Sequence, residues 1–265
     1  MTPSGSHFWN DNGYLILDGF FGDDDLVQFE QDVADLLRAR KERAGSITID
    51  VLTGSESGRR LLRDVSDAAL THPYKLNDLF LELDSCRALT LNARLVAVMR
   101  DLLGGEPLII NSLSFRQGSQ QPPHFDTYYM PPPQENAMVV SSICLEDHST
   151  SSGPLTYFPG SHKIPAYRFS NGGLNAIDDE MQAATDFAMA EIRARGLRRE
   201  EFVGKRGDVF LWHAQLYHGG TPIADESLTR RTLVTHYWRM EDMAPEMVAH
   251  CAHGVYMKRG HQPVP

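Results

Sequence analysis

The sequence predicts a mainly β fold, an antiparallel sandwich or jelly roll, that follows a helical N-terminal part. After Pro107 the chain breaks into short runs rich in β-branched and aromatic residues, separated by Gly, Pro, Asn and Ser. This punctuation is typical of an antiparallel all-β core. The runs are "PLIINSLSFRQG", "NAMVVSSICLED", "GPLTYFPGSH", "GDVFLWHAQLYHGG" and "RRTLVTHYWRM".

The segment before Pro107 contains the signals of helices. Three aspartates at 23–25 supply N-cap candidates, and apolar residues then recur at spacings of three and four. A second helix is predicted from Ser85 to the glycines at 104 and 105. Residues 72–83, "HPYKLNDLFLEL", are also predicted to be helical. The stripe of the first helix, which ends near Gly45, comprises Leu26, Phe29, Val33, Leu36 and Leu37.

The length of 265 residues is compatible with one domain, and we expect residues 1–265 to form it. The helical part covers about 1–105, and the β core covers about 107–240. Residues 174–202 contain a helical stretch, "DDEMQAATDFAMAEIRARGL", which is expected as an insertion at a mouth of the core. Such an insertion can serve as a lid or as an oligomer contact.

Composition limits the classes of partner. The net charge of −10 argues against a nucleic-acid or acidic-membrane surface, because these partners need clustered Lys and Arg. Three widely separated cysteines indicate neither a disulfide framework nor a CxxC site. The sequence shows no leader pattern and no run of about eighteen apolar residues, so a cytoplasmic location is expected. We expect a small-molecule substrate, and a homodimer is left open.

The stretch "QQPPHFDTYYMPPP", residues 120–133, contains a candidate metal site. In a strand His124 and Asp126 would project to the same face, as two ligands of one metal do. Taken alone, such a pair is more often two ordinary polar residues at the end of a strand.

His218 in "LYHGGTP" is the candidate third ligand. Two histidines and one carboxylate form the facial triad of non-haem Fe(II) oxygenases, which leaves three coordination positions open. The alternative is a strand-end histidine bonded to a carbonyl. Histidines elsewhere, among them His148 and His236, are expected to be structural or exposed.

An iron site of this type also predicts an anion clamp for the free carboxylate of a dicarboxylate cosubstrate. Arg suits this role because its planar fork binds carboxylates in a bidentate manner. Arg230 and Arg231 follow His218, and strand alternation lets only one of them face inward. A pair of surface arginines is the alternative.

Together these motifs resemble the phytanoyl-CoA dioxygenase family of Fe(II)- and 2-oxoglutarate-dependent oxygenases. The resemblance covers most of the chain and follows the order "DNGYLILDGFF", "HFD", "LEDHSTSSGPLTYFPGSH", "GDVFLWHAQLYHGG" and "RRTLVTHYW". It implies a double-stranded β-helix, a cupin-like jelly roll, with Fe(II) held by His124, Asp126 and His218. It also implies that Arg230 binds 2-oxoglutarate, with Gln121 as a weaker match to a second contact.

The activity implied by the resemblance is hydroxylation of an aliphatic C–H bond, with consumption of O2 and 2-oxoglutarate and release of succinate and CO2. The presence of Asp126 favours hydroxylation over halogenation. A secondary metabolite or an amino-acid-like molecule is the expected substrate, as in natural product biosynthesis. Desaturation, ring closure and epimerisation use the same centre and stay open.

The sequence departs from the family pattern at three places, one of which is the helical stretch at 174–202, longer than the shortest relatives need. Gly219 and Gly220 follow the distal histidine where many relatives have Gly-Ser, so Thr232 is the candidate to replace the missing hydroxyl. Ser142 stands where an aromatic residue is common, which would open the pocket. The candidate substrate-binding residues are Tyr128, Tyr129, Ser142 and Trp212, although the three aromatics could equally be packing residues.

Two rival functions remain at this point. One is a catalytically inactive jelly-roll protein that binds a ligand, and the other is a cupin-like metalloenzyme that does not use 2-oxoglutarate. The intact triad argues against the first and Arg230 against the second.

Overall fold

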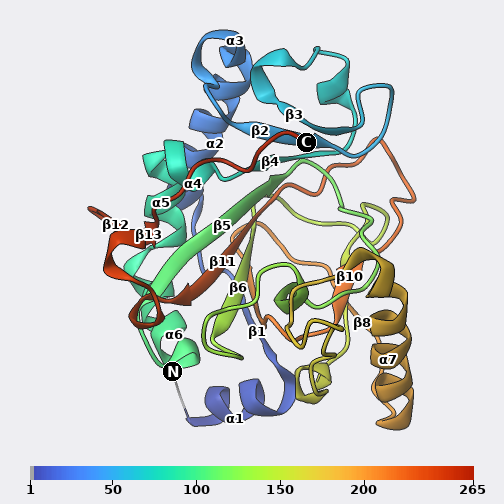
Figure 1. Ribbon diagram of the computed structural model, residues 1–265. Helices are drawn as coiled ribbons and strands as arrows, with labels where there is room; N and C mark the ends of the chain where they lie inside the picture. Colours follow the sequence, from blue (N-terminus) through green and yellow to red (C-terminus); the bar gives the residue numbers. More distant parts are fainter. Residues whose placement is uncertain (1–2) are drawn as a thin grey trace.

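The computed structural model of the protein describes residues 3–265 and shows two antiparallel sheets with helices packed around them (Figure 1). The main path of the larger sheet has the order β1-β9-β6-β11-β5-β4-β2-β3, and the smaller sheet has the order β10-β7-β8. Side chains from both sheets, including Val140, Tyr157 and Trp212, meet in one buried cluster. The sheets therefore pack face to face, which confirms the predicted jelly-roll class.

The strands of the larger sheet are β1 (Tyr14–Leu17), β2 (Thr48–Val51), β3 (Gly58–Leu61), β4 (Tyr74–Asn77), β5 (Pro107–Phe115), β6 (Met138–Cys144), β9 (Val209–His213), β11 (Thr232–Arg239), β12 (Val248–Cys251) and β13 (Gly254–Met257). Those of the smaller sheet are β7 (Leu155–Tyr157), β8 (Glu200–Phe202) and β10 (His218–Gly220). The pairing is antiparallel except where β13 joins β5.

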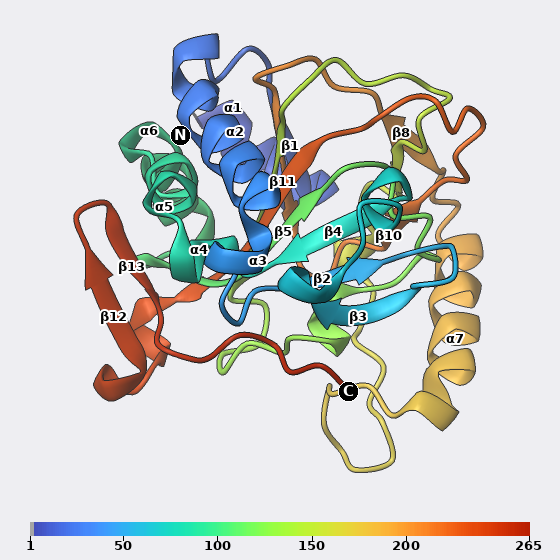
Figure 2. The same cartoon turned by 90° about the horizontal axis from the view of Figure 1, so that it is seen from above.

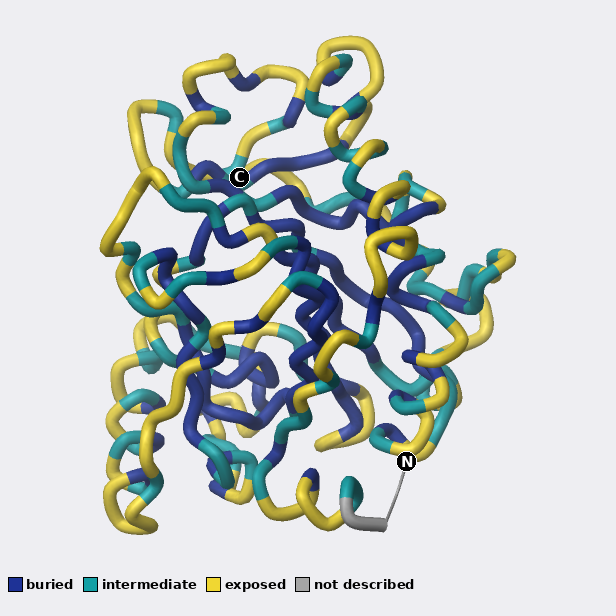
Figure 3. The backbone as a smooth tube through the Cα atoms, turned by 180° about the vertical axis from the view of Figure 1, so that it is seen from behind, coloured by how far each residue is buried: buried dark blue, intermediate teal, exposed yellow. Residues whose placement is uncertain are grey.

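Helices cover the outer face of the larger sheet, and buried residues concentrate where the two layers meet (Figures 2 and 3). The helix α2 (Asp23–Arg38) begins with three aspartates, and the Asp25 carboxylate accepts a hydrogen bond of 2.9 Å from the backbone N–H of Gly22. Its residues Leu26 and Phe29 are fully buried, which contributes about 1.5–3 kcal/mol each. The other helices of this layer are α3 (Arg40–Arg43), α4 (Leu79–Glu82), α5 (Asp84–Thr90) and α6 (Ala93–Leu103).

Two helices lie away from this layer, α1 (Pro3–Asn12) and α7 (Met181–Ala194). The helix α7 falls within the expected insertion and stands beside β8 and β10 at the edge of the molecule (Figure 1). Its buried residues Ala184, Ala188 and Ile192 share a cluster with Phe125 and Tyr128, which flank the candidate metal ligand Asp126. None of the described helices combines the length and the apolar character needed to cross a membrane.

The prediction of a helix over residues 72–83 is wrong for its first half. Tyr74–Asn77 forms the strand β4, which pairs with both β2 and β5, and only Leu79–Glu82 is helical. Its short apolar run fits either state, and the strand partners decide it. The predicted second helix is also divided, because the side chain of Asn92 caps a new start and accepts a bond of 3.0 Å from the backbone N–H of Arg94.

The segment after β13 runs back across the sheet toward β2 and β3 (Figure 2). It is held by Arg259, whose guanidinium donates two hydrogen bonds, of 2.6 and 2.9 Å, to the fully buried carboxylate of Asp78. The same guanidinium donates to the carbonyl of Ile110 on β5. A buried ion pair with this many bonds fixes the segment against the sheet.

Replacing Asp78 by Asn should lower the free energy of unfolding by about 3 kcal/mol, because Arg259 would lose its charged partner. Asn tolerates the left-handed backbone at this position (φ 59°), so the change tests the ion pair alone. Asp35→Asn is the matched control, since its partner Arg38 is 77% exposed, and it should change stability by less than about 1 kcal/mol. Urea unfolding measures both; equal losses would contradict the assigned role of Asp78.

Candidate metal centre

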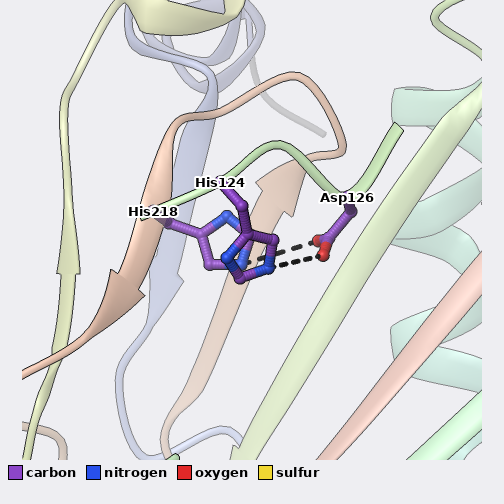
Figure 4. A group of neighbouring side chains, drawn as sticks. All are labelled: His124, Asp126 and His218. Carbon is purple, nitrogen blue, oxygen red and sulfur yellow. Dashed lines mark ion pairs between the residues drawn. The ribbon is translucent and has the colours of Figure 1, made fainter. Parts of the chain in front are cut away.

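Three side chains from two segments distant in the sequence point toward one another (Figure 4). His124 and His218 form a bridge in which each backbone N–H donates to the other's carbonyl, at 2.8 and 3.0 Å. Asp126 follows as the first residue of a 3-10 turn. One ligand atom from each of the three side chains lies within 4.8 Å of the other two.

Backbone carbonyl groups fix the orientation of each imidazole ring separately. The Nδ1 atoms of His124 and His218 each lie 2.9 Å from the carbonyl oxygen two residues earlier, that of Pro122 and Leu216 respectively. An Nδ1–H that donates to a carbonyl leaves Nε2 with a free lone pair. These Nε2 atoms face the Asp126 carboxylate at 3.4 and 3.7 Å.

The Asp126 carboxylate is buried and oriented from behind. The indole Nε1–H of Trp212 donates a bond of 2.9 Å to its Oδ2, which leaves Oδ1 directed toward His124. Burial opposes its ionisation, but the surrounding histidines outweigh burial and hold the pKa of Asp126 well below its usual range. Burial lowers the pKa of His218 to about 4. At neutral pH the site therefore presents an anionic carboxylate and a neutral imidazole, the forms that bind metal.

A third histidine, His236, lies beside the triad and was not expected there. Its Nε2 is 3.7 Å from Asp126 Oδ2, and its Nδ1 is 3.5 Å from the amide nitrogen of Asn111. The register aligns His236 with Asn111 on β5 and Val140 on β6. Strand alternation from Thr232 would have placed His236 on the inner face, and this was the signal available in the sequence.

Two of the three candidate ligands, His124 and Asp126, line a cavity of about 690 Å³, whereas His218 is not among its lining residues. His236 on β11 also lines it, as do residues of β5, β4 and β3 of the same sheet and residues after β13. The remaining lining residues are Arg59, Lys75, Ile110, Asn111, Leu113, Gln121, Tyr129, Met130, Pro131, Asn175, Trp238, Met257, Arg259 and Gln262.

The two neighbouring arginines point in opposite directions. Arg231 lies outside, where it contacts the carboxylates of Glu146 and Glu30 at 2.7 and 3.1 Å. Arg230 is 5% exposed, and within the described residues its guanidinium has no carboxylate partner and its Nε has no hydrogen bond. Burial lowers the pKa of Arg230 to about 10, which leaves it charged at neutral pH. An unpaired buried cation is costly and marks a site for an anion.

The sequence profile described as Phytanoyl-CoA dioxygenase (PhyH) matches residues 9–232. The chain belongs to the phytanoyl-CoA dioxygenase family. The peroxisomal phytanoyl-CoA dioxygenase of Rattus norvegicus is 22% identical over 242 residues, which cover 87% of this chain and 66% of the relative. The Homo sapiens protein is 24% identical over 83% of this chain and 63% of its own length. The match thus spans just under two thirds of these relatives.

Solved structures share the fold of this phytanoyl-CoA dioxygenase family member. The α-ketoglutarate-dependent carbocyclase SnoK from nogalamycin biosynthesis has a TM-score of 0.66 at 15% identity, over 90% of this chain and 84% of that one. EctD from S. alaskensis, solved with 2-oxoglutarate and 5-hydroxyectoine, has a TM-score of 0.65 at 19% identity, over 91% and 77%. The epimerase SnoN, in complex with Fe3+ and α-ketoglutarate, has a TM-score of 0.60 at 17% identity, over 98% and 97%.

The structure places the four candidate substrate residues of this family member in different surroundings. Tyr129 is 50% exposed, lines the cavity, and packs edge-on against the His124 ring. Tyr128 is buried in the aromatic cluster below the triad, and its hydroxyl accepts a bond of 3.0 Å from the backbone N–H of Tyr167. Trp212 holds the carboxylate, and Ser142 is buried in β6. The last three are not among the cavity-lining residues.

The candidate cosubstrate residues lie in two places. Gln121 lines the cavity beside His124. Thr232 is fully buried near Arg230, and its Oγ1 has no hydrogen-bond partner among the described residues. His148, expected to be structural or exposed, is buried in the same region, and its Nε2 also lacks a partner within residues 3–265. Its Nδ1 lies 3.8 Å from Cys144 Sγ, and Cys144 is directly opposite Thr232.

His148 should make the fold sensitive to acid. Burial, and then the charge of Arg230, lower the pKa of His148 to about 4, below the value near 6.5 in the unfolded chain. Between pH 6.5 and 4 the unfolded state binds a proton that the folded state does not, so stability falls as pH falls. The contribution of this group reaches roughly 3 kcal/mol at pH 4.

Urea unfolding of the parent and of His148→Gln at pH 7, 6, 5 and 4 measures this contribution. The variant should lose less stability than the parent between pH 6.5 and 4. Identical slopes would show that His148 does not contribute.

Proposed function

We propose that this protein is an Fe(II)- and 2-oxoglutarate-dependent oxygenase that hydroxylates an aliphatic C–H bond of a small molecule. The observation that supports this most strongly is the combination of an oriented His124–Asp126–His218 triad with the buried, unpaired Arg230. Membership of the phytanoyl-CoA dioxygenase family supports the same reaction class.

The donor set fits Fe(II). Two imidazole nitrogens and one carboxylate oxygen are the ligands of the facial triad, and their hydrogen bonds to Pro122, Leu216 and Trp212 orient them before metal arrives. His236 Nε2 also lies close to the Asp126 carboxylate, at 3.7 Å, without a hydrogen bond to it in this geometry. When bound, Fe(II), 2-oxoglutarate and O2 supply the oxidation that converts a C–H bond to C–OH.

The region around Arg230 fits the remote carboxylate of 2-oxoglutarate. Arg230 Nε, Thr232 Oγ1 and His148 Nε2 are buried without partners among the described residues, so each can donate a hydrogen bond. A carboxylate there would neutralise Arg230 and use these donors. Gln121 is assigned a weaker contact at the cavity side. The predicted choice of Arg230 over Arg231 agrees with the burial of one and the ion pairs of the other.

Hydroxylation is proposed because Asp126 completes the triad, and a natural-product or amino-acid-like substrate is proposed from the cavity and the relatives. SnoK and SnoN are named a carbocyclase and an epimerase of nogalamycin biosynthesis, and EctD was solved with 5-hydroxyectoine. The cytoplasmic location, the single-domain organisation and the open question of a homodimer stay predictions. The inactive binding protein and the 2-oxoglutarate-independent enzyme are the rivals that the following experiments exclude.

Anaerobic addition of Fe(II) and 2-oxoglutarate should produce the weak visible charge-transfer absorption of the chelate. His124→Ala removes one of three ligands and should weaken Fe(II) binding more than about 100-fold, so the band should disappear at equal concentrations. His250→Ala changes an exposed histidine and should leave the band intact. A parent protein without the band, or a band that survives in His124→Ala, would refute the site.

Arg230→Met should raise the Kd of 2-oxoglutarate at least about 30-fold, because a buried charged partner is lost. The same change should increase the unfolding free energy without cosubstrate by about 1–4 kcal/mol, because an uncompensated buried charge is removed. Arg231→Met is the matched control and should change the affinity by less than about twofold. Titration of the absorption band and urea unfolding give both quantities, and equal affinity losses in the two variants would contradict the assignment.

A further inference from the structure

We propose that the substrate carries a carboxylate, and that Arg59 of β3 and Lys75 of β4 bind it at the end of the cavity away from the metal. This inference depends on the proposed oxygenase function, because it assigns the substrate class of the same site. Neither Arg59 nor Lys75 belongs to the triad or to the residues assigned to 2-oxoglutarate.

The cavity wall carries an excess of positive charge. Arg59, Lys75 and Arg259 all line it, and Asp126 is the one acidic side chain among the described lining residues. Asp126 is assigned to the metal. The carboxylates that pair with the three cations, Asp50 and Asp78, are not among the lining residues. A molecule entering the cavity therefore meets the cationic partners and not the carboxylates behind them.

Arg59 and Lys75 share a single carboxylate. Asp50 accepts two bonds from Arg59, at 2.7 and 3.0 Å, and lies 3.4 Å from Lys75 Nζ. It also accepts a bond of 3.0 Å from the amide of Asn77. Two cations with one anion leave one positive charge, which a monoanionic carboxylate would neutralise. The Nη1 group of Arg59 and two N–H bonds of Lys75 remain to donate to it.

Arg259 differs from this pair. Its guanidinium is neutralised by Asp78 and also donates to the carbonyl of Ile110. Arg259 therefore forms part of the cavity wall and adds little net charge to it. The surplus charge is therefore localised at Arg59 and Lys75, whose side chains are 26% and 20% exposed and so accessible to a ligand.

The position of the pair sets the length of the substrate. Lys75 is opposite Phe115 on β5, whereas Asn111 on the same strand is opposite His236 at the metal end. Four residues of strand separate these rows by about 13 Å along the strand, and the two strand spacings from β4 to β11 add about 10 Å across the sheet. The bound carboxylate thus lies on the order of 10 Å from the reacting C–H bond. Apolar residues such as Leu113, Met257 and Trp238 line the cavity and suit an apolar middle of the molecule.

The test uses the anaerobic protein loaded with Fe(II) and 2-oxoglutarate, with binding followed by calorimetry. The probes are ω-phenyl carboxylic acids with chains of four to eight carbons, each compared with its neutral amide and its phosphonate. At least one acid should bind the parent ten or more times more tightly than its amide. Arg59→Met and Lys75→Met should each reduce this preference several-fold, and the double variant should abolish it.

Each single variant leaves Asp50 with one cationic partner, so the fold is preserved. Arg59→Lys keeps the positive charge and should retain the preference for the acid over its amide. Arg63→Met, an exposed arginine just after β3, is the matched control and should change nothing. The absorption band of the chelate should persist in all variants, whereas its loss from the parent would refute the proposed function instead. Absence of any acid preference, its survival in the double variant, or tighter binding of the phosphonate would overturn the carboxylate assignment.

Discussion

The pair of backbone hydrogen bonds between His124 and His218 is the interaction on which the site depends. It joins the segment after β5 to the start of β10. Two histidines that are far apart in the sequence are thereby brought together. Each imidazole is then fixed by a carbonyl two residues before it. The geometry of the triad is therefore set by the main chain, and only the Asp126 carboxylate needs a side chain, Trp212, to orient it.

Much of the fold, and the grouping of the three candidate metal ligands, could be predicted because the signals are local. The punctuated β runs predicted the jelly roll, and His-x-Asp, the later histidine and the arginine pair are each visible in a few letters. The strand β4 could not be predicted, since its short apolar segment is compatible with a helix until β2 and β5 are placed beside it. The roles of Tyr128 and Trp212 depend on the 3-10 turn at Asp126, which rotates neighbouring side chains away from simple strand alternation.

The cationic side chains of the protein differ in whether a carboxylate neutralises them. Arg231 on the outside and Arg259 in the cavity wall have carboxylate partners of their own. Inside, Arg230 has none among the described residues, and Arg59 shares Asp50 with Lys75. These partly buried positive charges are not fully neutralised by carboxylates in the folded protein. Bound ligands are therefore expected to supply part of its stability. The residues that lower the stability of the ligand-free fold are therefore the residues assigned to ligand binding.

The segment after β13 contributes Arg259 and Gln262 to the cavity wall but none of the three candidate metal ligands. The triad comes from β10 and the segment after β5, whereas this side of the wall comes from β3, β4 and the final part of the chain. The proposed function thus assigns oxidation chemistry and substrate recognition to separate stretches of the chain. New specificities can arise by exchanging the recognition stretches while the reactive centre keeps its geometry.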